Sequence, residues 1–214
     1  MASTTPWVSL GVVQALTLLS TGTCEDSEDP HNTAEASLCT RNPDMHRSEP
    51  FSGMDRDPDE QQYIVAEMTA LITRDPTNAQ AYFRRGNAWS NLRDYTQARH
   101  DLDRVIALEP GNALAYNNRG IAFLCTGDAE TAIGDLTQAI ALDPAYRDAY
   151  HNRGLAYTEV GKLEEAIADL THAIALDPAF WSAYRHRGLV YAMRGDHDAS
   201  FRDYLKAREL AGGQ

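Results

Sequence analysis

Few side chains in this sequence have the types and spacing of a reaction centre. The polar cluster closest to a metal-binding motif is Asp196-His197-Asp198, which lies at a predicted turn. Successive side chains at the start of a helix point in different directions, so we interpret this cluster as a solvated, helix-capping turn. The chain's cysteines lack the spacing of a zinc site: Cys24, Cys39 and Cys125.

Catalytic motifs are also missing from the sequence. It contains no glycine-rich phosphate loop, no His-Glu-x-x-His and no nucleophile elbow. We therefore predict a protein with no catalytic residue, no bound metal and no cofactor.

The strongest pattern is an internal repeat with a period of 34 residues. The stretch ALAYNNRGIAFLCTGDAETAIGDLTQAIALDPAY, residues 113–146, returns as RDAYHNRGLAYTEVGKLEEAIADLTHAIALDPAF, residues 147–180. Related copies occupy residues 79–112 and 181–214. A fixed period of this length indicates an array of stacked structural repeats.

Each copy has the pattern of two helices joined by a short turn. In the second copy, apolar residues at helical spacing run from Tyr116 to Phe123, and the pattern breaks at Thr126–Gly127. A second apolar stripe follows and stops at Asp143-Pro144. Asn78 and Asn112 precede first helices and are predicted N-caps.

The turns between the two helices carry glycine in three copies and arginine in one. Glycine tolerates the left-handed backbone conformation that such turns need. The glycines are Gly127, Gly161 and Gly195, whereas the first copy has Arg93, so its turn should be less ideal.

Small and bulky residues recur in register along the copies. Glycine falls midway along each first helix, although glycine there costs about 1 kcal/mol relative to alanine. That repeated cost indicates a close helix crossing where no larger side chain fits. The glycines are Gly86, Gly120, Gly154 and Gly188, and the facing bulky columns are Tyr82, Tyr116, Tyr150, Tyr184 and Trp89, Phe123, Tyr157, Tyr191.

These aromatic, glycine, alanine, leucine and proline columns resemble the tetratricopeptide repeat (TPR) family, from Ala79 to the C-terminus. The resemblance implies an all-α fold, a right-handed α-solenoid of stacked antiparallel helix pairs. One departure is an arginine directly before each glycine, where leucine is more usual. We predict that these arginines (Arg85, Arg119, Arg153, Arg187) pair with an aspartate column on a packed neighbouring helix (Asp101, Asp135, Asp169, Asp203). Such pairs fix the register of helices more reliably than they add net stability.

The first helices line the concave groove that binds partners in TPR arrays. By that resemblance the partner-binding residues here are Phe83, Arg84, Asn87, Asn117, Asn118, Ile121, His151, Asn152, Leu155, Arg185, His186 and Leu189. Asparagine can donate and accept hydrogen bonds at once, so Asn118 and Asn152 could hold the backbone of an extended peptide. This is similar to the asparagine ladder of O-linked N-acetylglucosamine transferase arrays. The alternative is that both amides satisfy neighbouring backbone.

Two other interpretations of this groove are less favoured. TPR domains that grip acidic chaperone tails place lysines and arginines there, and these first helices have no lysine. His151 and His186 lie on successive first helices and could approach each other. Two histidines alone do not predict a metal site, whereas a pH-dependent partner contact is consistent with histidine chemistry.

The composition is that of a globular protein with an acidic balance. The chain has 214 residues, is 43% hydrophobic and has a formal charge of −12. Residues 1–60 hold eleven acids and three bases, hence −8, and the remainder holds twenty acids and sixteen bases, hence −4. Nucleic acids and anionic membrane surfaces need a basic footprint, so neither is an expected partner.

The N-terminal part divides into three predicted segments. Residues 1–24 contain an apolar run of about 13 residues, too short to span a bilayer, and form either a signal peptide or a disordered leader. Cys24 could carry a lipid, or pair with Cys39 if the segment is exported. Residues 25–59 are an acidic, proline-containing linker predicted to be disordered. Residues 60–76 look like the second half of a repeat and would cap the array.

The sequence therefore predicts a non-enzymatic adaptor that binds a peptide or partner helix in its concave groove, with no integral membrane span. Weak self-association through exposed ends of the array is also expected. Two alternatives remain: a cell-envelope assembly factor or lipoprotein exported by residues 1–24, and a substrate-recruiting subunit of an enzyme complex. An exported protein would be secreted, periplasmic or envelope-associated, and the other possibility is the cytoplasm.

Overall fold

The computed structural model describes residues 57–212. The chain divides into two units, residues 1–35 and 36–214, and every described residue belongs to the second. The predictions for residues 1–24, for the linker up to residue 56, and for Cys24 and Cys39 lie outside the described residues.

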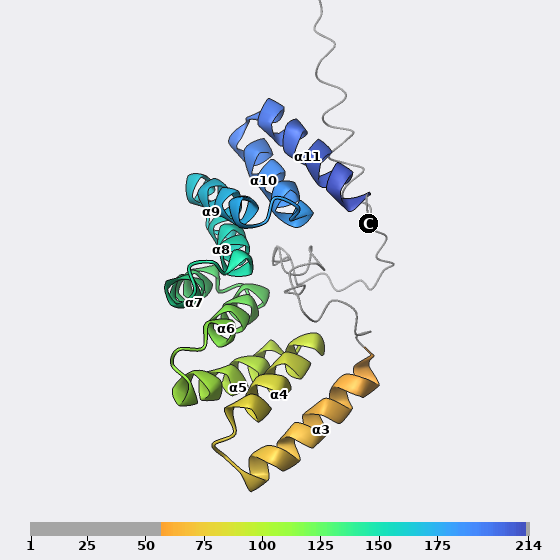
Figure 1. The fold of residues 1–214 in the computed structure, drawn as a ribbon, viewed down its shortest axis with the longest axis vertical. Coiled ribbons are helices and arrows are strands. Elements are labelled where there is room, and N and C mark those ends of the chain that lie inside the picture. Colours follow the sequence, from red (N-terminus) through yellow and green to blue (C-terminus); the bar gives the residue numbers. More distant parts are fainter. Residues whose placement is uncertain (1–56, 213–214) are drawn as a thin grey trace, which may run out of the picture. The chain divides into compact units, whose positions relative to one another are not determined.

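Residues 57–212 form nine helices and no strand, as the all-α prediction required (Figure 1). The helices are α3 (Pro58–Arg74), α4 (Ala79–Asn91), α5 (Tyr95–Leu108), α6 (Ala113–Cys125), α7 (Ala129–Leu142), α8 (Arg147–Glu159), α9 (Leu163–Leu176), α10 (Trp181–Arg194) and α11 (His197–Ala211).

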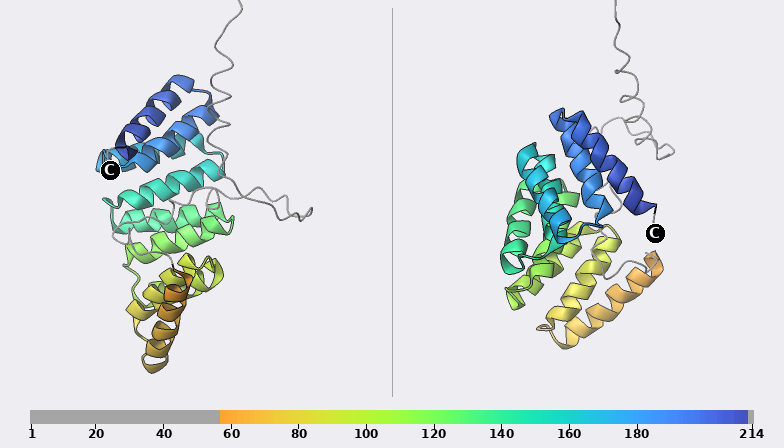
Figure 2. Two further views of the ribbon diagram at one scale, coloured as in Figure 1. Left: turned by 90° about the vertical axis from the view of Figure 1, so that its right-hand side faces the viewer. Right: turned by 45° about the horizontal axis from the view of Figure 1, so that its top comes forward.

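The helices stack as antiparallel pairs in chain order. Each helix packs against the next one along the chain, from α3·α4 to α10·α11 (Figures 1 and 2). The first helices also contact one another across repeats, at α4·α6, α6·α8 and α8·α10, more extensively than any two second helices do. The first helices therefore lie on the inner side of this α-solenoid.

Helix starts follow the capping chemistry in the sequence. The predicted N-caps are confirmed, because Asn78 Oδ1 accepts from Ala81 N at 2.9 Å and Asn112 Oδ1 accepts from Ala115 N at 3.0 Å. Helix α3 starts at Pro58, two residues earlier than predicted. Asp57 caps it, and proline at the first helical position costs no hydrogen bond.

The four turns between paired helices all use a positive φ. It is 81° at Gly127, 75° at Gly161 and 88° at Gly195. The first turn reaches the same region with Arg93 at 61°, which confirms that this turn is less ideal.

The glycine column marks close helix crossings, as predicted, but the predicted facing residues were wrong: leucines of the paired helix, and not the aromatic columns, lie opposite Gly120 and Gly154. A Cβ at Gly120 would lie 2.8 Å from Leu136 Cγ, and one at Gly154 would lie 2.9 Å from Leu170 Cγ. Both leucines are fully buried, so neither can move aside without disturbing the core. These glycines let the paired helices approach closely.

Helix α3 covers the first face of the array. Met68 is fully buried, and Gln61 Oε1 accepts a hydrogen bond from Asn91 Nδ2 at 2.9 Å. The helix thus packs on α4 in the way that later second helices pack on the next first helix.

Candidate partner-binding surface

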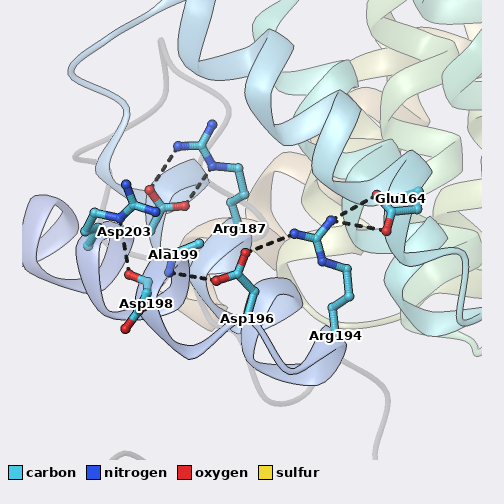
Figure 3. Close-up of polar contacts among 8 residues, drawn as sticks. Glu164, Arg187, Arg194, Asp196, Asp198, Ala199 and Asp203 are labelled. Carbon is cyan, nitrogen blue, oxygen red and sulfur yellow. Dashed lines mark hydrogen bonds and ion pairs between the residues drawn. The ribbon is translucent and has the colours of Figure 1, made fainter.

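The arginine and aspartate columns form a ladder of bidentate ion pairs within the helix pairs. Arg153 Nε donates to Asp169 Oδ2 at 2.7 Å, and its Nη2 donates to Asp169 Oδ1 at 2.9 Å. The same two bonds join Arg85 to Asp101, Arg119 to Asp135 and Arg187 to Asp203 (the last in Figure 3). Hydrogen bonds to these carboxylates raise the pKa of each guanidinium. The pairing predicted from the sequence is present in all four copies.

Each of these arginines also reaches back to the preceding repeat through Nη1. The acceptor lies sixteen residues earlier in every case: Thr69, Asp103, Thr137 and Thr171. The ladder therefore joins neighbouring repeats as well as paired helices. Sequence reasoning missed this link, although a polar column at the 34-residue period was there to find.

The cluster Asp196-His197-Asp198 has the capping role expected for it. Asp196 Oδ1 accepts from Ala199 N at 3.1 Å and its other oxygen accepts from Arg194 (Figure 3). Across residues 57–212 no group of three or more histidine, cysteine or acidic side chains could hold a metal ion.

The twelve predicted partner-binding residues all lie on the first helices, and they fall into two sets. We call these twelve residues the inner face. Six of them are buried: Asn117, Ile121, His151, Asn152, Leu155 and His186. The other six keep some exposed surface: Phe83, Arg84, Asn87, Asn118, Arg185 and Leu189.

A chain of side-chain amides runs along the inner face across three repeats. Asn152 Nδ2 donates to Asn117 Oδ1 at 3.0 Å, and Asn117 Nδ2 donates to Asn118 Oδ1 at 3.1 Å. Asn118 Nδ2 then donates to Asn87 Oδ1 at 2.9 Å. The amides bond to one another and not to neighbouring backbone. The buried members Asn117 and Asn152 tie repeats together, while Asn87 and Asn118 remain partly accessible.

The two histidines continue this polar chain into the last repeat. His151 Nε2 lies 2.8 Å from His186 Nδ1, so one imidazole donates to the other. Burial lowers the pKa of His151 to about 3 and holds the pKa of His186 well below its usual value. The positive charges of Arg147 and Arg185 act in the same direction on His151. Both rings therefore stay neutral near pH 7, and this arrangement does not support the expected pH-dependent contact.

The accessible part of the inner face combines three kinds of group. Asn87 and Asn118 offer amides, Arg84 and Arg185 offer guanidinium groups, and Phe83 and Leu189 lie beside them in the helical register. Arg185 also lies over the Trp181 ring, with its Cζ 5.5 Å from the centroid. Such a surface can hydrogen-bond a peptide backbone, attract a carboxylate and contact an apolar side chain.

None of the helices between residues 57 and 212 is both long and apolar enough to cross a membrane.

The fold and the repeat columns define a TPR protein, and known structures agree. MamA from Desulfovibrio magneticus RS-1 is 26% identical with a TM-score of 0.67, over 72% of this chain and 87% of that one. The first TPR of Spaghetti (RPAP3), bound to the HSP90 peptide SRMEEVD, is 26% identical with a TM-score of 0.54, over 56% of this chain and 96% of that one. YrrB, described as a TPR protein with an unusual peptide-binding site, shares the fold at 20% identity, with a TM-score of 0.61 over 71% of this chain and 78% of that one.

The family can be stated more closely. The ETO1 C-terminal domain family matches residues 51–193, which is more than half of the chain. The chain belongs to this family. No curated protein matches it.

Proposed function

We propose that this chain is a non-enzymatic adaptor whose inner face binds an extended segment of a partner protein. The observation that carries the proposal is the pair of partly accessible amides, Asn87 and Asn118, at the end of a buried amide chain. The buried members hold both in place, so a partner meets preformed hydrogen-bonding groups and little ordering entropy is lost on binding.

The hydrogen-bond inventory of these amides favours a backbone ligand. The Nδ2 group of Asn118 has two hydrogens, and one of them is committed to Asn87. The side-chain oxygen of Asn87 accepts the hydrogen bond from Asn118. The two Nδ2 hydrogens of Asn87 can then bond an acceptor such as a peptide carbonyl. Arg84, which is exposed on α4, favours a segment that also carries a carboxylate. The RPAP3 TPR, which resembles part of this chain, is bound to a peptide with adjacent acidic residues.

The test is affinity purification from native extract with the full chain as bait, followed by mass spectrometry. The double variant Asn87→Ala/Asn118→Ala should lose the partner that the unmodified chain captures. Gln138→Ala removes an exposed amide from the second helix α7 and is the matched control, which should keep it. Equal capture by both variants would reject the inner face as the binding surface. A transferase or protease that co-purifies with the chain would instead favour the substrate-recruiting role.

Export by residues 1–24 remains a prediction from the sequence alone. Cell fractionation with N-terminal sequencing of the mature protein tests it. An intact Met1 in a cytosolic pool would remove the cell-envelope alternative.

A further inference from the structure

The side of α11 that would face a following repeat occupies the position of an interface between repeats. In earlier copies, this side of the second helix packs on the next first helix. Ile133 of α7 lies against a cluster that includes Leu155, and Ile167 of α9 lies against one that includes Val190. One period after Ile167 the chain has Phe201. This face of α11 is the same surface with no helix of residues 57–212 beyond it.

The arginine ladder of residues 57–212 has no acceptor at the equivalent position of this face. Its back-reaching acceptors are Thr69, Asp103, Thr137 and Thr171, and the next position in the series is Leu205. Leucine cannot accept a hydrogen bond from an arginine. A ladder bond of this kind therefore cannot form on this face.

The exposed residues of this face form one strip along α11: Asp198, Phe201, Leu205 and Arg208. Their spacing of three, four and three residues places them on one side of the helix. Phe201 is 64% exposed and Leu205 is 41% exposed, so the strip has an apolar centre. Its two ends carry opposite charges.

This charge order makes the strip complementary to itself. When two such helices pack antiparallel about a point near Asp203, Phe201 of each meets Leu205 of the other. In the same register Asp198 of each meets Arg208 of the other. A C2 interface needs a patch that matches its own rotated copy, and this strip meets that condition.

We propose that a second copy of this chain packs on the Asp198–Arg208 strip of α11, antiparallel, to form a two-fold symmetric dimer. A strip of four side chains offers less than the roughly 800 Å² per partner of a stable interface, so the dimer is weak, with a dissociation constant of about 100 µM. This association does not depend on the inner face.

Sedimentation of the full chain from about 10 µM to about 1 mM tests the dimer. Asp198→Arg alone and Arg208→Asp alone each turn two attractive contacts into two repulsive ones, so each should weaken self-association by about tenfold. An equimolar mixture of the two variants should associate again as a heterodimer, because both contacts become attractive in the mixed pair.

A second pair of variants tests the apolar centre. Leu205→Asp should abolish the dimer, and Leu176→Asp, at an end of α9 with 39% exposure, should leave it unchanged. Unfolding midpoints confirm that both variants are folded. A chain that stays monomeric at about 1 mM overturns the proposal and leaves the strip to a different protein. Self-association that is insensitive to the charge variants, or a mixture no stronger than its components, overturns it as well.

Discussion

Gly154→Ala should destabilise the array, although alanine normally stabilises a helix. The added Cβ would lie 2.9 Å from Leu170 Cγ and 3.3 Å from both Leu170 Cδ2 and Ala166 O. Leu170 is fully buried and Ala166 O belongs to the backbone of α9, so neither neighbour can yield cheaply. Overpacking of this kind costs about 1–3 kcal/mol, against a helix-propensity gain of about 1 kcal/mol. The net loss should be about 1 kcal/mol.

Gly134→Ala is the matched control in the neighbouring helix pair. Gly134 lies within α7, and a Cβ there would meet no atom within 4 Å. This variant gains the helix propensity of alanine without the clash, so it should be more stable by about 1 kcal/mol. The difference between the variants, about 2 kcal/mol, isolates the cost of the close crossing.

Thermal unfolding followed by circular dichroism measures both effects. For an array of this size, Gly154→Ala should lower Tm by about 3 °C and Gly134→Ala should raise it by about the same amount. If Gly154→Ala raises Tm as much as Gly134→Ala does, the close packing of α8 on α9 is refuted.

Two further predictions concern buried charge and buried imidazole. Arg153→Met should lower the free energy of unfolding by about 2–4 kcal/mol in urea titrations, because it leaves the buried Asp169 carboxylate unpaired. Arg194→Met, which breaks only exposed pairs, should leave the urea midpoint unchanged. The unfolded chain protonates His151 below about pH 6.5, whereas the folded chain does so only near pH 3. The free energy of unfolding should therefore decrease as the pH falls from 6.5 towards 3, and protonation of His151 in the unfolded chain should account for about 2 kcal/mol of this loss at pH 5. His151→Gln should reduce this pH dependence in unfolding midpoints measured at pH 7.5 and pH 5. If the pH dependence is the same in His151→Gln, His151 is not both buried and neutral in the folded chain.

The helix pairs could be predicted from the sequence because their signals are local or strictly periodic. The caps Asn78 and Asn112 act on amides three residues away. The column of Gly120 and Gly154 repeats every 34 residues against equally periodic leucines. The arginine ladder could be predicted for the same reason, because each arginine of the column has an aspartate at the same offset, as Arg153 has Asp169.

The inner face was predicted less completely, because resemblance gives helical positions but not side-chain partners. Asn118 and Asn152 are one period apart, yet Asn152 pairs with Asn117 and Asn118 pairs with Asn87. Which amide meets which depends on how neighbouring first helices pack. The burial of His151 depends on the same packing, and that burial moves its pKa away from neutrality.

Photo-crosslinking in native extract tests the central claim most directly. A photoreactive phenylalanine analogue at Phe83 places the probe on the inner face, and the same analogue at Leu142 places it at the end of the second helix α7. We predict that the probe at Phe83 captures one partner protein, that the probe at Leu142 does not, and that Asn87→Ala/Asn118→Ala abolishes the capture. Capture of the same partner from Leu142, with nothing captured from Phe83, would contradict the account.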